Sequence, residues 1–225
     1  MSVGVSALRI PNQRAVIDRR ALAAAVAEAV SALGPKKARA RVVALLKPAQ
    51  SAGRAELTRR LDDRPSAGHE ITQGHAFLAD QLIRVIHDHV IADLHPRPEG
   101  AKERLTLIAV GGYGRGEMAP HSDIDIAFIT PDKPTEWAEQ VIETMLYYLW
   151  DLSLKVGHSS RSVAEAMRMT KADLTIRTAM LEGRYLWGDQ PLYEEVSGRF
   201  WAEVVKGTEA QFVTEKLTER KREAA

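Results

Sequence analysis

Residues Leu107 to Thr130 read LIAVGGYGRGEMAPHSDIDIAFIT, and this stretch decides the fold that the sequence predicts. An apolar run at 104–110 leads directly into four glycines, and a second apolar run at 123–130 carries two aspartates one residue apart. Short apolar runs rich in β-branched residues predict two strands joined by a glycine-rich turn. Because side chains at i and i+2 of a strand share a face, Asp123 and Asp125 are expected to point together.

These residue types are typical of a phosphate and metal site. Two neighbouring carboxylates repel each other unless a cation lies between them, and Mg²⁺ commonly combines one or two carboxylates with substrate phosphates. A glycine turn leaves backbone N–H groups open to phosphate oxygens, to which Arg115 adds charge-assisted hydrogen bonds, and the Ser122 hydroxyl is a candidate to orient an aspartate or a phosphate. The turn glycines are Gly111, Gly112, Gly114 and Gly116. The pattern therefore predicts metal-assisted displacement at phosphorus.

Each half of this pattern also has a simpler explanation. Glycine-rich turns often follow strands, and an alternating DIDI segment can be an edge strand with one solvated face. The two halves together, with Asp123 eleven residues after Gly112, favour the phosphate site. A Rossmann fingerprint is excluded because Glu117 stands where its third glycine belongs, and a P-loop is excluded because no G-K-[ST] follows the glycines.

Helical patterns flank this core on both sides. Apolar spacing predicts helices over 18–33, 41–46, 56–61, 70–94, 137–150, 163–169, 174–186 and 192–205, with Pro48 ending the second of them. Alternation over 152–157 predicts a third strand, and DDRPSAG at 62–68 predicts a linker. The expected fold class is α+β, with a helical arm and linker over 1–68, the core domain over 69–205 and the beginning of a further helical segment over 206–225.

Composition limits the classes of partner. The 225 residues carry 31 basic and 30 acidic side chains, a formal charge of +1, which lacks the positive excess of a nucleic-acid-binding protein. No apolar run approaches the roughly 20 residues that span a bilayer, and there are no cysteines. We therefore expect a cytoplasmic protein with neither a nucleic acid nor a membrane as its partner.

Two segments resemble a known family. GGYGRGEMAPHSDIDIAF at 111–128 closely resembles the nucleotidyltransferase motif of the polymerase-β superfamily. WDLSLKVGHSSR at 150–161 resembles the W-D-x-G-L-x-V-G-H-S-x-R segment of bacterial bifunctional PII uridylyltransferase/uridylyl-removing enzymes, and LTIRTAMLEGRYL at 174–186 also fits. The resemblance covers roughly residues 70 to 218 and implies that 69–205 is a polymerase-β-like nucleotidyltransferase palm, a small mixed sheet with flanking helices.

The resemblance also implies a reaction. UMP would pass from UTP to a tyrosine hydroxyl of the PII signalling protein, releasing pyrophosphate, with Mg²⁺ (or Mn²⁺) bound by Asp123 and Asp125 and the triphosphate held by the glycine turn. The superfamily normally supplies a third carboxylate from a neighbouring strand. Asp151 is the candidate because it precedes the predicted third strand and shares a face with Ser153 and Lys155, although a helix-capping role for Asp151 remains equally open.

The chain also departs from the family. Ser153 and Ser160 replace the family's usual glycine and small apolar residue, and the family's enzymes are several times longer, with an HD-type uridylyl-removing domain and two glutamine-sensing ACT domains. The His87-Asp88 dipeptide lies in a predicted helix, where a structural or solvated role is expected. The chain therefore resembles a truncated N-terminal portion. The alternatives are another nucleotidyltransferase of this fold, acting on a small molecule, an RNA or a protein, and a non-catalytic nucleotide-binding fragment.

Overall fold

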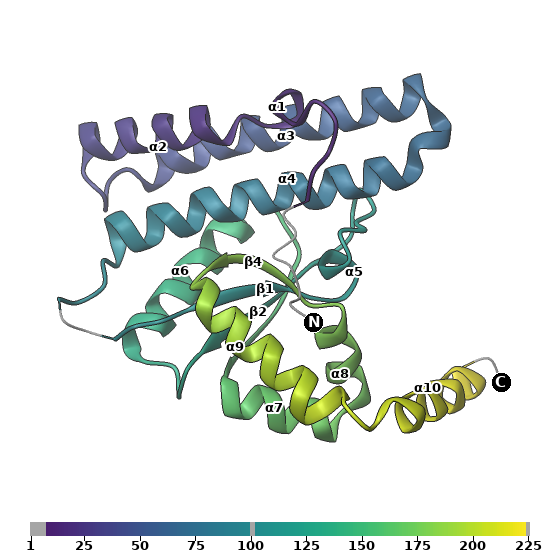
Figure 1. Ribbon diagram of the computed structural model, residues 1–225. Coiled ribbons are helices and arrows are strands. Elements are labelled where there is room, and N and C mark those ends of the chain that lie inside the picture. Colours follow the sequence, from purple (N-terminus) through teal and green to yellow (C-terminus); the bar gives the residue numbers. More distant parts are fainter. Residues whose placement is uncertain (1–7, 100–101, 224–225) are drawn as a thin grey trace.

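The computed structural model describes residues 8–99 and 102–223 (Figure 1). The helices ahead of the sheet are α1 (Gln13–Val16), α2 (Arg19–Leu33), α3 (Arg39–Asp63) and α4 (Gly68–His89), with a 3-10 turn at Pro65–Ala67 and a π-helical turn at Val90–Leu94. The strands are β1 (Thr106–Ala109), β2 (Ile124–Thr130), β3 (Val156–Ser162) and β4 (Arg184–Gly188). The other helices are α5 (Gly111–Gly114), α6 (Glu136–Asp151), α7 (Val163–Ala172), α8 (Leu174–Leu181), α9 (Gln190–Phe200) and α10 (Glu209–Glu223), with a π-helical turn at Trp201–Val205.

The chain forms a four-stranded mixed sheet between two sets of helices, which confirms the predicted α+β fold class. The strand order is β3-β2-β1-β4, with β1 antiparallel to β2 and β4, and β2 parallel to β3. In Figure 1 the arm helices α2 and α3 lie together with α4 above the sheet, and α7 and α9 lie below it. Among the described residues, no helix is long and apolar enough to cross a membrane.

Residues 39–63 form one helix, α3, where the sequence predicted two helices over 41–46 and 56–61. Helix α3 continues through Pro48 because this residue lies on the exposed face, where the carbonyl that loses its partner can bond to water. The buried face of α3 presents Val42, Leu46 and Leu57 to the neighbouring helices α2 and α4. Burial of this face on both sides of the proline offsets the roughly 3 kcal/mol that an internal proline costs.

The fourth strand was not expected, because the spacing over 174–186 predicted a single helix. Helix α8 ends at Leu181, and Gly183 closes the turn by donating its N–H to the Met180 carbonyl at 3.0 Å. Residues 184–188 then pair with β1, with Tyr185 opposite Ile108. The prediction was wrong because strand pairing with a distant segment decided the conformation.

The third strand lies further along the chain than predicted. Residues 152–154 form the turn that ends α6, with Ser153 at a φ of 56° and the Leu154 N–H bonded to the Leu149 carbonyl at 3.1 Å. The strand itself begins at Val156. The alternating pattern arose because Leu152 is buried and Leu154 is partly buried within that turn.

The two faces of the sheet have separate apolar clusters. Ile124, Ile126 and Phe128 of β2 face the cluster that contains α4, α6 and the arm helices. Ala127 and Ile129 face the cluster formed with α7 and α9. The domain boundaries at 68 and 205 stay a prediction. The first seven residues of the predicted arm and the last two residues of the predicted segment over 206–225 lie outside the described residues.

Candidate functional site

The Asp125 carboxylate lies at the junction of β2, β3 and the glycine turn. Asp125 is half-buried, and alternation along β2 puts its side chain on the face of Ala127 and Ile129. It pairs across the parallel ladder with Gly157, and a Cβ atom at Gly157 would overlap Asp125 Oδ1. A Cβ atom at Gly111 would lie 3.5 Å from Oδ2 of the same carboxylate. The two carboxylate oxygens thus lie between two glycines, one from the turn and one from the neighbouring strand.

Asp123 lies just ahead of β2 and is exposed. The pKa of the Asp125 carboxyl is raised, first because burial disfavours its charged form and second because the Asp123 charge repels that form. The predicted place of Asp123 and Asp125 on one strand face stays a prediction, because β2 begins at Ile124. A divalent cation between two such carboxylates would relieve the repulsion, and oxygen donors of this kind suit Mg²⁺ or Mn²⁺.

The first half of the glycine turn is open to a ligand. Gly111 and Gly112 begin the single helical turn α5 and are partly exposed. Their N–H groups have no acceptor within the helix because the first residues of a helix lack a preceding carbonyl. Gly111 has a φ of 61°, a conformation that a residue with a side chain rarely adopts. Gly111 lies beside Asp125, and the two N–H groups can donate hydrogen bonds to phosphate oxygens.

The second half of the turn packs against the protein instead. Gly114 and Gly116 are buried. A Cβ atom at Gly114 would lie 2.8 Å from the Ala109 carbonyl oxygen, and one at Gly116 would lie 2.7 Å from Leu8 Cδ2. Glycine at these positions allows close packing of the backbone. Their predicted contact with the triphosphate stays a prediction.

Arg115 is held by two carboxylates of its own chain. Its Nε lies 2.9 Å from Glu117 Oε2 and its Nη1 lies 2.6 Å from Glu182 Oε1, and these bonds raise the pKa of Arg115. The guanidinium is exposed, and a phosphate that binds it would share it with these two acids. Its predicted role in phosphate binding therefore stays a prediction.

The two remaining predicted residues have local partners. The Ser122 hydroxyl accepts the Ala119 N–H at 3.1 Å, which closes the turn ahead of Asp123. Asp151 is the last residue of α6, and its carboxylate accepts a hydrogen bond from Arg39 Nη2 at 2.8 Å. The expectation that Asp151 shares a strand face with Ser153 was wrong, because these residues form a helix end and a turn.

The third catalytic carboxylate therefore lacks the geometry on which its prediction rested, and the role of Asp151 itself stays a prediction. Within 8–99 and 102–223, no group of three or more His, Cys, Asp and Glu side chains could hold a metal ion together. Binding of a metal by Asp123 and Asp125 together with substrate phosphates stays a prediction.

A buried polar network that the sequence analysis missed fixes the turn in place. Asp80 of α4 is fully buried and accepts the Tyr113 hydroxyl at 2.8 Å. Arg184 of β4 donates to both Asp80 oxygens, at 2.7 and 3.0 Å, and to the Gly114 carbonyl at 3.2 Å. Burial raises the pKa of Tyr113 well above its usual value, which keeps the hydroxyl a donor. The signal in the sequence was an aspartate among the apolar residues of the amphipathic pattern over 70–94.

Comparison with known proteins places these residues in a family context. Residues 52–160 match the family described as "Putative nucleotidyltransferase DUF294". The chain is 64% identical over 213 residues to a bifunctional uridylyltransferase/uridylyl-removing enzyme of Novosphingobium aromaticivorans, and 48% identical over 214 residues to one of Rhodospirillum rubrum. Each alignment covers 94% of this chain and 23% of the relative. The chain thus spans about a quarter of the length of the curated relatives that it matches.

Proposed function

Because this chain is homologous to the N-terminal portion of bifunctional uridylyltransferase/uridylyl-removing enzymes and carries a match to a nucleotidyltransferase family, we propose that it transfers UMP from UTP to a tyrosine hydroxyl of the PII signalling protein, releasing pyrophosphate. The reaction belongs to nitrogen and glutamine sensing in the cytoplasm. The observation that carries this proposal is the position of the Asp125 carboxylate between Gly111 of the turn and Gly157 of β3.

The residues of the site divide the work of this reaction. The Gly111 and Gly112 N–H groups bind phosphate oxygens of the nucleotide and fix its position beside the two acids. Asp123 and Asp125 would hold Mg²⁺ or Mn²⁺; the pKa of Asp125 is raised first by burial and second by the repulsion from Asp123 that such an ion would relieve. When bound, the ion supplies positive charge that offsets the charge of the triphosphate and of the departing pyrophosphate. The half-buried setting of Asp125 strengthens these electrostatic interactions relative to water.

The test is incubation of the chain with radiolabelled UTP, Mg²⁺ and PII. We expect label on PII with the wild type, and less than about one hundredth of that rate with Asp123→Asn or Asp125→Asn, the scale on which loss of a charge-stabilising group lowers turnover. Asp132→Asn is the matched control, since Asp132 is an exposed acid beyond the other end of β2. Label that persists in the Asp123→Asn/Asp125→Asn double variant contradicts the mechanism.

A second candidate is a nucleotide-binding module that turns over only together with further parts of a longer protein. The observation that favours it is that the chain covers 23% of the length of its relatives. Metal-dependent UTP binding with no labelled product would support this candidate. The same incubation with labelled ATP separates these two candidates from a nucleotidyltransferase of different specificity, for which ATP would be the better nucleotide donor.

A further inference from the structure

A basic groove lies where the N-terminal segment crosses α4. It is lined by residues 8–20 and by Phe77, Gln81 and Arg84 of α4, and its volume is about 780 Å³. In Figure 1 the chain ahead of α1 passes across α3 and α4, and residues of this segment line the groove. Its five arginines are Arg9, Arg14, Arg19, Arg20 and Arg84. We call this surface the arginine groove.

The wall of the groove is fixed to the protein core. Ile10, Val16 and Ile17 are buried in the main apolar cluster. Arg60 of α3 donates hydrogen bonds to the Pro11 carbonyl at 2.8 Å and to the Asn12 carbonyl at 3.0 Å. The segment is therefore anchored at several points, and the arginines on it keep a defined spacing relative to α4.

Arg84 is paired with the buried Asp80 of its own helix, with 3.8 Å between Nη2 and Oδ2, whereas the positive charges of Arg9, Arg14 and Arg20 have no acidic partner in the described part of the chain. The acid that lines the groove, Asp18, caps α2 by accepting the N–H groups of Arg20 and Ala21 at 3.1 Å each. Arg9, Arg14 and Arg20 are exposed, and none of them forms an ion pair within the described ranges. Residues 1–7 contain no acidic side chain that could serve. These three guanidinium groups are available to an anionic partner.

The rest of the basic surface continues toward β4. Arg19 and Arg84 lie over the ring of Trp187, at 5.3 and 4.9 Å from its centre, which holds both guanidinium groups in place. A second hollow of about 510 Å³ shares Arg84 and Trp187 and adds Arg97. Asp88 also lines this hollow, and one of its carboxylate oxygens accepts the Trp187 indole N–H at 2.5 Å.

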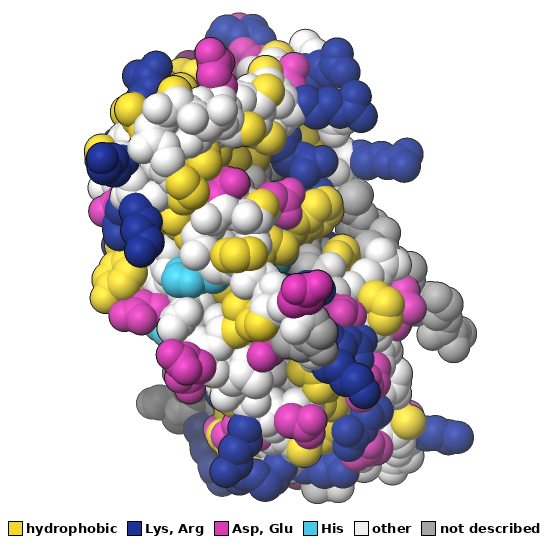
Figure 2. Space-filling model, turned by 90° about the vertical axis from the view of Figure 1, so that its left-hand side faces the viewer, with side chains coloured by type: hydrophobic (Ala, Val, Ile, Leu, Met, Phe, Trp, Pro, Cys, Tyr) yellow, Lys and Arg dark blue, Asp and Glu magenta, His cyan; other side chains and the backbone are white. Residues whose placement is uncertain are grey.

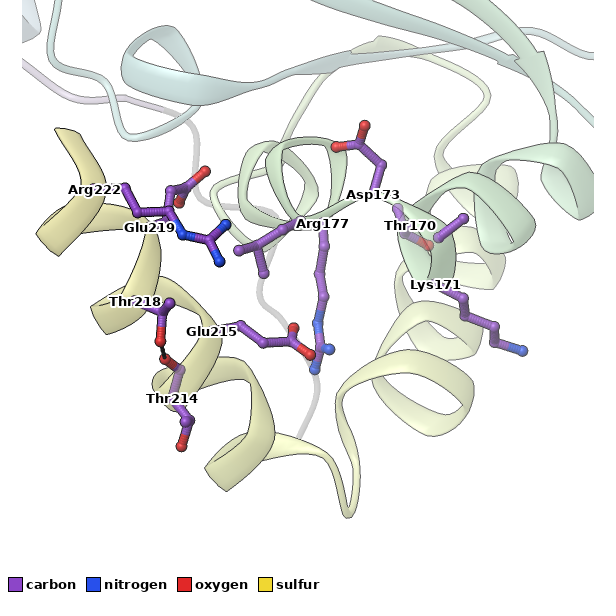
Figure 3. Close-up of a pocket in the computed structure, with 11 residues that line it drawn as sticks. Thr170, Lys171, Asp173, Arg177, Thr214, Glu215, Thr218, Glu219 and Arg222 are labelled. Carbon is purple, nitrogen blue, oxygen red and sulfur yellow. Dashed lines mark hydrogen bonds between the residues drawn. The ribbon is translucent and has the colours of Figure 1, made fainter.

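Charged side chains are distributed unevenly over the protein, and other hollows lack the basic excess of the arginine groove. Figure 2 shows Lys and Arg side chains gathered along the upper and lower edges of the face that it presents, although the whole chain carries a charge of only +1. The hollow of about 660 Å³ between α8 and α10 makes the contrast (Figure 3). Three basic and three acidic side chains line it, namely Lys171, Arg177, Arg222, Asp173, Glu215 and Glu219.

We propose that the arginine groove binds an acidic segment of the protein acceptor, an inference that rests on the proposed transfer to a protein. Guanidinium groups bind carboxylates through paired, charge-assisted hydrogen bonds. The groove begins beside the site, because Leu8 both lines it and contacts Gly116 of the glycine turn. An acceptor held there lies next to the turn that receives the nucleotide. The groove is open and extends along residues 8–20, a shape that suits an extended chain better than a compact anion.

The test measures binding of PII to the chain directly, without turnover. In the Arg9→Glu/Arg14→Glu/Arg20→Glu variant, we expect at least tenfold weaker PII binding, mainly through a slower association rate, and a weaker dependence on salt. The Kd for UTP should stay within twofold of the wild type. The matched control is Arg220→Glu/Lys221→Glu/Arg222→Glu, which makes the same change in charge on the exposed last turn of α10 and should leave PII binding within twofold.

Several outcomes overturn the proposal. Unchanged PII binding in the groove variant does so, as does equal weakening in the α10 control, which would indicate net charge alone. Stronger binding of inorganic triphosphate or of a 20-nucleotide RNA at the groove would assign it to those ligands instead. If PII is labelled as fast by the groove variant as by the wild type, the transfer stands and the groove proposal fails. If PII binds through the groove but is never labelled, the groove stands and the transfer fails.

Discussion

Replacement of Gly157 by alanine is predicted to disable the site while the fold survives. Gly157 has no positive φ, so its backbone conformation accepts a side chain. The new Cβ atom, however, would lie less than 3.0 Å from Asp125 Oδ1, whereas ordinary contact begins at 3.4 Å, and the carboxylate must therefore move by more than 0.4 Å. Since misplacement by about 1 Å costs roughly 100-fold in a positioned site, we expect roughly 10- to 100-fold weaker metal-dependent UTP binding.

The measurement is calorimetric titration of UTP in the presence of Mn²⁺, with circular dichroism to confirm that the variant is folded. The matched control is Gly198→Ala, because nothing lies within 4 Å of the added methyl group in helix α9. This control should gain about 0.5–1 kcal/mol of stability from the better helix propensity and keep its UTP affinity. Wild-type affinity in the Gly157→Ala variant would refute the assigned position of Asp125.

Three further predictions concern the surroundings of the site. Tyr113→Phe removes a hydrogen bond to the buried Asp80 carboxylate and should lower the free energy of unfolding, measured in urea, by about 2 kcal/mol. A loss below about 0.5 kcal/mol, the scale of a hydrogen bond between uncharged groups at the surface, would contradict the buried network. Leu46→Ala in the fully buried face of α3 should cost about 3 kcal/mol in one cooperative transition, whereas two separate transitions would indicate an arm that folds independently. Burial and the Asp123 charge raise the folded-state pKa of Asp125, so its protonation is favoured by folding. The stability that protonated Asp125 contributes to the metal-free protein is therefore lost as the pH rises from its unfolded-state pKa through its folded-state pKa. The affinity for Mn²⁺ has the opposite dependence and falls as the pH drops through the folded-state pKa, because the metal needs the ionised carboxylate. Asp123→Asn should lower the Asp125 pKa in a carboxyl NMR titration, and an unchanged value would show that the two groups do not interact.

Two buried charged residues that the sequence analysis did not single out, Asp80 and Arg184, hold the glycine turn of the site in place. Asp80 lies within an apolar helical pattern, and Arg184 lies in a segment whose spacing predicted a helix. Asp80 has a weak partner in its own helix, Arg84 at 3.8 Å, but its short hydrogen bonds go to Tyr113 and Arg184, which lie far away in the sequence. The two meet because α4 and β4 both pack beside the glycine turn, where Arg184 and Asp80 are 104 residues apart in sequence.

The sequence by itself determined the features that depend on near neighbours. The alternation of Ile124 and Ile126 with the two aspartates predicted β2 and the burial of both isoleucines, and the Asp18 side chain with Gly34 sets the ends of α2. Strand periodicity, capping and turn conformation arise from residues a few positions apart, so a single sequence contains the information.

Tertiary structure alone decided which distant residues meet. The parallel register of β2 and β3 places Gly157 opposite Asp125, and a shift by one residue would put a histidine or a valine there. The pairing of β4 with β1 overrode a helical pattern, and packing on both sides carried α3 through Pro48. In each case the deciding energy comes from contacts between segments far apart in the chain, which local spacing does not encode.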